Sequence, residues 1–95
     1  MKIKDIYEQA IELSLCANAY QFSQEFLGMH KSYYGMLKVS GKQPSTVSLV
    51  NLYGAIQNKI NTLNNNSSQE LVKLQNIADT VIQEIKKRGS NKSHF

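Results

Sequence analysis

One predicted helix, over residues 31–39, presents side chains whose chemistry suits a polyanion. Tyr34 and Leu37 are three residues apart and share a face, which predicts the buried side of this helix. The side chains left on its flanks and outer face for contacts to bases are Lys31, Ser32, Tyr33 and Met36. They supply an ammonium group, two hydroxyls and a thioether, with no carboxylate. Core packing remains the alternative for Tyr33 and Met36.

The charge distribution favours the same partner. The chain has 11 Lys and Arg against 7 Asp and Glu, which gives a formal net charge of +4. No acidic residue lies between Glu25 and Glu70, and the lysines of this interval are Lys31, Lys38, Lys42 and Lys59. The positive excess is therefore concentrated on the predicted helix and its neighbours. Lysines that only solvate a surface are the alternative explanation.

The elements around this helix follow from capping signals and apolar spacing. Asn18 is expected to cap one helix, and His30 or Ser32 could cap the next, at 31–39. Gly28 lies between these two helices and predicts a left-handed turn there. An earlier helix is predicted over residues 1–15. A loop over 39–45 precedes a helix that starts at Ser45 or Thr46 and runs to about residue 63. The chain is therefore predicted to be all-α.

The order of these features resembles the lambda-repressor/Cro-like (XRE-type) helix-turn-helix family over residues 18–63. The residues that carry the resemblance are the run Gly28-Met29-His30-Lys31-Ser32-Tyr33-Tyr34-Gly35-Met36-Leu37, then Gly41-Lys42-Gln43-Pro44-Ser45, and the apolar series Leu49, Leu52 and Ile56. In three respects the chain departs from the family pattern. Asn18-Ala19 replaces the usual Thr-Gln opening, the run to Gly28 is one residue longer, and no arginine lies near the reading helix.

The resemblance implies a five-helix, lambda-repressor-like fold in which residues 1–63 form the helix-turn-helix DNA-binding domain and a C-terminal amphipathic helix follows. Its reading helix would enter the major groove, where Lys31 could donate to guanine, Ser32 to several acceptors, and the Met36 thioether could pack on a thymine methyl. The family places phosphate contacts around the following loop. For that role the resemblance implies Lys38, Lys42 and Gln43.

A C-terminal amphipathic helix is predicted over residues 69–88, after a polar hinge at 64–68, with Gly89 as its stop and residues 90–95 as a disordered tail. Its apolar positions alternate in steps of three and four, which is the spacing of a narrow packing seam. The seam consists of Leu71, Leu74, Ala78, Val81 and Ile85. Two interpretations stay open: the segment 64–89 packs on the domain, or it forms a homodimer interface that lets two subunits read two half-sites.

Other kinds of chemistry have little support in the sequence. Cys16 is single and lies among apolar residues, which excludes an intramolecular disulfide, and His30 has no partner that would make it a catalyst. No metal-ligand spacing, phosphate-binding glycine loop or long apolar run is present. We therefore expect a non-enzymatic, cytoplasmic protein with no cofactor, no metal and no membrane partner.

The predicted function is that of a sequence-specific, repressor-like transcriptional regulator that binds double-stranded DNA, as a homodimer. An alternative from another class is a helical protein-interaction module, because aromatic residues and Met are enriched at protein interfaces. An antitoxin-type regulator that binds a partner protein would combine both activities.

Overall fold

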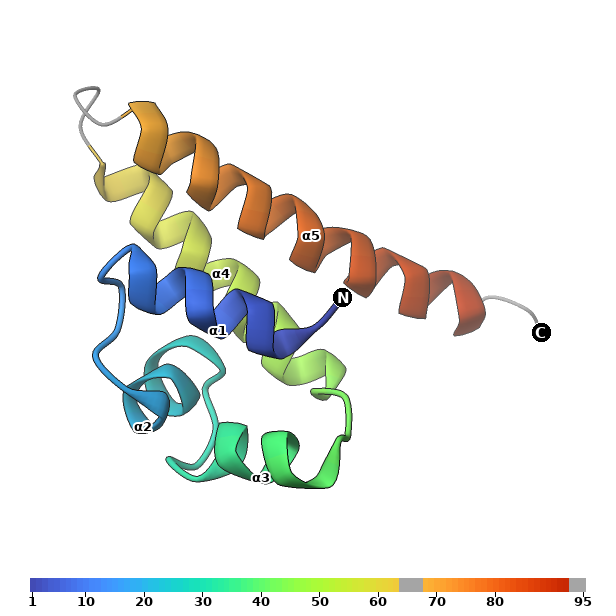
Figure 1. Ribbon diagram of the computed structural model, residues 1–95. Coiled ribbons are helices and arrows are strands. Elements are labelled where there is room, and N and C mark those ends of the chain that lie inside the picture. The colour runs from blue at the N-terminus through green and yellow to red at the C-terminus, as the bar shows by residue number, and fades with distance from the viewer. Residues whose placement is uncertain (64–67, 93–95) are drawn as a thin grey trace.

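The computed structural model describes residues 1–63 and 68–92, and within these ranges its regular elements are all helical. The elements are α1 (Ile3–Glu12), α2 (Ala19–Gln21), the π-helical turn η1 (Phe22–Phe26), α3 (Tyr33–Ser40), α4 (Thr46–Thr62) and α5 (Ser68–Lys92). Figure 1 shows α4 and α5 side by side, α1 across α4, and α2 with α3 below them. The predicted all-α class is confirmed.

The first helix is shorter than predicted because the chain forms a left-handed turn at Ser14. Its φ is +59°, and the amides of Ser14 and Leu15 donate to the carbonyls of Ile11 and Ala10. This is the hydrogen-bond pattern of a Schellman motif, which usually has glycine at the left-handed position. Because serine is not a usual signal for this turn, the end of α1 at Glu12 could not be predicted from the residue type.

The second helix changes from α-helical to π-helical hydrogen bonding. Asn18 caps α2 by accepting from the amide of Gln21 at 2.9 Å, as predicted, while the Gln21 side chain reaches back to the amide of Ala17 and not to that of Asn18. The Leu27 amide then donates to the Phe22 carbonyl, five residues earlier. A π turn takes up one more residue than an α turn. It therefore accommodates the extra residue in the run to Gly28.

Gly28 ends this segment in the left-handed conformation predicted for it, with φ +63°. The helix that follows begins at Tyr33 and not at Lys31, which corrects the predicted start. Lys31 and Ser32 thus lie on the approach to α3 instead of within it. Ser32 occupies the N-cap position without a side-chain cap bond, and its amide donates to His30 Nδ1 at 3.2 Å.

Of the two long helices, α4 has the predicted bounds and α5 extends beyond its predicted C-terminal end. Ser45 caps α4 as predicted, accepting from the amide of Ser48. Gly89 does not stop α5, which continues to Lys92, so residues 90–92 are helical and not a disordered tail. Residues 64–67 of the predicted hinge and residues 93–95 lie outside the described residues. In the described ranges, no helix combines the length and apolar character needed to cross a membrane.

The core is made by one face of every helix, including α5. Tyr34 and Leu37 are buried, as predicted, and so are Phe22, Phe26 and Leu27. From α5 the core receives Leu74, Ile77, Ala78 and Val81, and Ile85 packs at its edge. The seam proposed for dimerisation (Leu71, Leu74, Ala78, Val81 and Ile85) is therefore largely used within the chain. Leu74, Ala78 and Val81 are at most 4% exposed, so they are not available as an interface.

Candidate nucleic-acid interface

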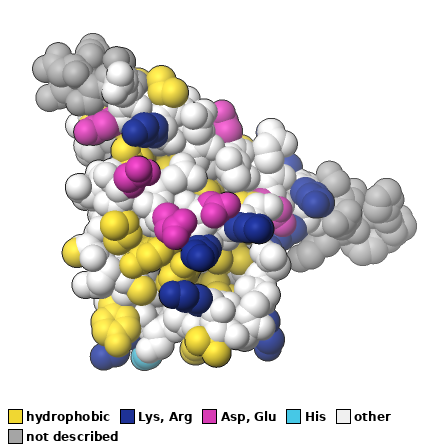
Figure 2. Space-filling model, viewed as in Figure 1, with side chains coloured by type: hydrophobic (Ala, Val, Ile, Leu, Met, Phe, Trp, Pro, Cys, Tyr) yellow, Lys and Arg dark blue, Asp and Glu magenta, His cyan; other side chains and the backbone are white. Residues whose placement is uncertain are grey.

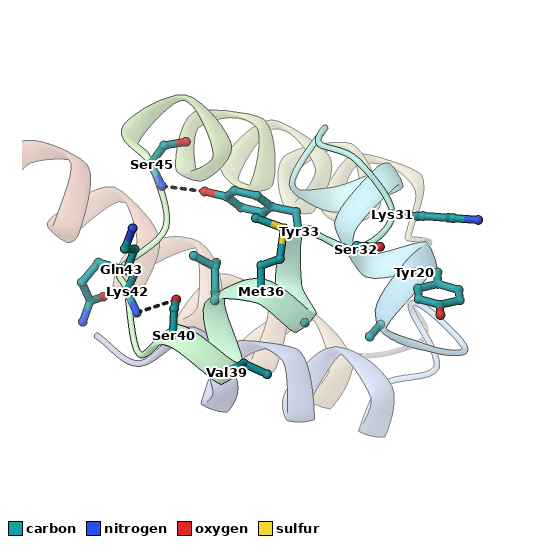
Figure 3. Close-up of a pocket in the computed structure, with 13 residues that line it drawn as sticks. Tyr20, Lys31, Ser32, Tyr33, Met36, Val39, Ser40, Lys42, Gln43 and Ser45 are labelled. Atoms are coloured by element: carbon teal, nitrogen blue, oxygen red, sulfur yellow. Dashed lines mark hydrogen bonds between the residues drawn. The ribbon is translucent and has the colours of Figure 1, made fainter.

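An open groove of about 840 Å³ runs over the outer side of α3 (Figure 3). Tyr20 and Lys31 lie at one end, Lys42 and Gln43 lie at the other, and Met36 is between them. The lining residues are Ala19, Tyr20, Lys31, Ser32, Tyr33, Gly35, Met36, Leu37, Val39, Ser40, Lys42, Gln43 and Ser45. The groove thus brings together six of the seven residues predicted to contact DNA. Lys38 is the exception.

The outer face of α3 is predominantly apolar. Residues one helical turn apart share a face, and this face consists of Ser32, Gly35, Met36, Val39 and Ser40. Met36 is 62% exposed and Val39 is 90% exposed, which rules out core packing for Met36. Val39 was missed in the sequence because it was assigned to the following loop. Its position three residues after Met36 is the signal that could have identified it.

The ammonium group of Lys31 lies over an aromatic ring at one end of the groove. Its ammonium nitrogen lies 5.7 Å from the centre of the Tyr20 ring, and both side chains are exposed. A cation over an aromatic face is weakly favourable at an exposed site. Tyr20 therefore lies beside the lysine that was predicted to contact bases, a contact that no local spacing in the sequence indicates.

Tyr33 has a different role from the one predicted. Its hydroxyl accepts from the amide of Ser45 at 2.9 Å and lies 3.3 Å from Ser48 Oγ, so it joins the start of α3 to the start of α4. Burial raises the pKa of this phenol, but the hydrogen bonds from Ser45 and Ser48 and the nearby Arg88 charge outweigh it and leave the pKa below its usual value. The Tyr33 hydroxyl is thus engaged within the protein and is not available to contact bases.

Lys38 belongs to a second, smaller hollow beside the groove, of about 200 Å³. The lysines that line it are Lys2, Lys4, Lys38 and Lys42, and Gln43 lines it too. Lys2 and Lys4 were not predicted to belong to this cluster because they lie far from the other lysines along the chain. On the face shown in Figure 2, the charged side chains of the lower part, around α3, are basic, and the acidic ones lie above them. The groove therefore borders a cluster of positive charge.

The position of α3 relative to α2 depends on a buried hydroxyl. Ser23 is 0% exposed; its Oγ donates to the Ala19 carbonyl and accepts from the Tyr34 amide at 3.0 Å. The first amides of a helix have no partner within the helix, so Ser23 supplies one that α3 lacks. In the sequence, the position of Ser23 inside an apolar run is the signal that could have predicted this contact between the helices.

The far end of α5 reaches the loop that forms one wall of the groove. Arg88 donates to the Pro44 carbonyl at 2.7 Å and to Thr46 Oγ1 at 3.2 Å, and it pairs with Glu84 at 3.1 Å.

We expect Arg88→Ala to lower the free energy of unfolding by about 1.5 to 3 kcal/mol, because hydrogen bonds from a partly buried charged donor are lost. Urea unfolding measures this change. The exposed neighbour Lys86→Ala should leave the midpoint unchanged, and equal effects of the two substitutions would contradict the role given to Arg88.

Within residues 1–63 and 68–92, no group of three or more His, Cys, Asp or Glu side chains is placed to hold a metal ion. Cys16 is buried, and this burial, with the Glu25 charge as a smaller cause, raises the pKa of its thiol. A raised pKa disfavours the reactive thiolate form. Among the described residues, the lysine-bordered groove is therefore the candidate binding site.

Fold and site together define an all-helical domain with an exposed, largely apolar groove bordered by lysines. The chain belongs to a family of unknown function, DUF6626, which matches residues 3–93. No curated protein gives a significant match. No solved structure does so either.

Proposed function

We propose that this protein is a DNA-binding transcriptional regulator that presents α3 to the major groove of duplex DNA. The observation that carries the proposal is that one accessible groove is lined by five predicted contact residues whose side chains remain available: Lys31, Ser32, Met36, Lys42 and Gln43. Lys31 and Met36 are exposed there, so a duplex can approach them. An α-helix with its side chains fits the width of the major groove.

The proposed fold is a lambda-repressor-like helix-turn-helix, in which α2 with η1 forms the first helix of the motif and α3 the second. Support comes from the tight left-handed turn at Gly28 between them and from the capped α4 that follows a loop containing Pro44. Lysines on both sides of α3 suit phosphates on the two sides of a groove. We propose a homodimer as the binding form, through a surface other than the buried residues of α5.

The salt dependence of binding tests the phosphate contacts. We expect Lys42→Ala to reduce the slope of log K against log salt by about 0.9, because each phosphate contact releases condensed counterions from duplex DNA. Lys42 is suited to this test since it is exposed and lines both hollows. Fluorescence anisotropy with a labelled random-sequence duplex, at several salt concentrations, gives the slope.

The matched control is Lys73→Ala, an exposed lysine on α5 that lines neither hollow. Its slope should equal that of the unmodified protein. If both substitutions change the slope equally, binding depends on net charge alone and Lys42 is not a specific contact. If the unmodified protein does not bind the duplex at low salt, the proposed function is wrong.

The apolar character of the groove favours one further candidate, a module that binds a partner protein. Met36 and Val39 are large exposed apolar side chains on one helix face, and Met is enriched at protein interfaces. The two functions differ in an observable way. A protein-binding module would show no affinity for duplex DNA at low salt, whereas the regulator binds random sequence weakly through its lysines.

A further inference from the structure

We infer that the groove recognises DNA through the methyl groups of thymine and therefore selects duplexes with thymines in the major groove facing α3. This inference rests on the proposed function and names the base chemistry that the site would read. Its basis is the chemistry of the outer face of α3. There, the two large side chains are Met36 and Val39, and both are apolar.

Hydrogen-bond donors suited to bases are scarce on this face. Gly35 has no side chain, and the space above it is open, with no atom within 4 Å of where a Cβ would lie. The donors of the face itself are the two short hydroxyls of Ser32 and Ser40, of which Ser40 also accepts from the Lys42 amide at 3.2 Å. The Tyr33 hydroxyl is engaged with Ser45. Lys31, at the groove's end over the Tyr20 ring, offers a point charge instead of the planar fork that reads guanine bidentately.

Thymine is the base whose major-groove edge carries an apolar group, its C5 methyl. Met36 is flexible and polarizable, so its thioether can fill an irregular gap between such methyls. Val39, 90% exposed, adds a second apolar contact one turn further along α3. The open space above Gly35 allows the helix backbone to come close to the base edges. Together these features complement a row of methyl groups.

Charge complementarity argues for DNA as the occupant of this apolar groove. Lys31 and Lys42 border the groove, and Lys2, Lys4 and Lys38 lie around the adjoining hollow. No acidic residue occurs between Glu25 and Glu70, the interval that supplies α3 and its loop. A peptide with an apolar anchor would gain nothing from this cluster unless it were acidic. A duplex provides both phosphates and methyl groups.

Replacement of thymine by deoxyuridine tests the inference, because it removes the C5 methyl and keeps the base pair. Duplexes are first selected from a random library, and the best binder is then synthesised with dT or with dU throughout. We expect the dU duplex to bind about fourfold more weakly for each contacted methyl, on the scale of one buried methylene. Fluorescence anisotropy at a fixed salt concentration measures both affinities.

Two variants locate the effect on α3. In Met36→Ala and Val39→Ala, the ratio of dT to dU affinity should fall toward one, since the apolar partner of the methyl is lost. Val72→Ala is the matched control: Val72 is 57% exposed on α5 and does not line the groove. It should keep the full ratio. All three positions are exposed and helical, so alanine is compatible with the fold.

The outcomes separate this inference from the proposed function. Equal affinity for the dT and dU duplexes, with binding retained, overturns the thymine inference and leaves DNA binding intact. A selected duplex without thymine overturns it as well. A ratio that persists in both the Met36 and the Val39 variant shows that other residues read the methyls and overturns the assignment to α3. Absence of binding to every duplex in the library overturns both proposals.

Discussion

Gly28→Ala is expected to lower the free energy of unfolding by about 2 to 3 kcal/mol, from backbone strain and one lost hydrogen bond. Gly28 has φ +63°, where a Cβ is unfavourable. An added Cβ would also lie 2.4 Å from Nδ2 of Asn51. That nitrogen donates to the Leu27 carbonyl at 3.0 Å, so the Asn51 side chain must give up this bond to make room. Urea unfolding followed by circular dichroism measures the change.

Gly41→Ala is the control that separates strain from the Asn51 contact. Gly41 has φ +72°, but nothing lies within 4 Å of its Cβ position, so only the backbone term of about 1 kcal/mol applies. Combining Gly28→Ala with Asn51→Ala should cost less than the sum of the single changes, because both remove the same hydrogen bond. Equal losses at Gly28 and Gly41 would show that Asn51 does not constrain the turn.

Features with strong local signals were predicted well from the sequence. The left-handed turn at Gly28, the cap at Ser45 and the buried pair Tyr34 and Leu37 each depend on neighbours in the chain, and all are present. Side-chain chemistry together with helical spacing also identified four residues that line one groove, Lys31, Ser32, Tyr33 and Met36, and the resemblance added Lys42 and Gln43. For those four the period of the helix was enough, because they all lie within residues 31–36.

Features that depend on tertiary contacts could not be read in the same way. Ser14 ends α1 by a turn that usually contains glycine, and Gly89, a usual stop, lies inside α5. The seam on α5 has the same spacing whether it faces α4 or a second subunit, so only the packing of Leu74 and Val81 decides between them. Tyr33 was misassigned for the same reason, since its partners Ser45 and Ser48 lie more than ten residues away.

The largest loss of stability is expected from Phe22→Ala, because Phe22 is the ring through which α1, η1 and α3 meet. It is 0% exposed and lies 5.2 Å from the ring centre of Tyr7 and 5.6 Å from that of Tyr34, edge-on to both. Removing a buried phenylalanine side chain costs about 3 to 5 kcal/mol through lost burial and the cavity left behind. A domain of this size is stable by roughly 5 to 14 kcal/mol, so the variant should unfold at a far lower urea concentration.

Two substitutions show whether this effect comes from burial or from ring geometry. Phe22→Leu keeps most of the apolar volume and should cost about 1 kcal/mol, the scale of edge-on aromatic contacts. Tyr20→Ala, two residues earlier and 59% exposed, should change stability by less than about 0.5 kcal/mol. A Phe22→Ala protein as stable as Tyr20→Ala would mean that α3 is not anchored through this cluster. The groove over α3 would then lack the rigid support on which selective contact with base edges depends.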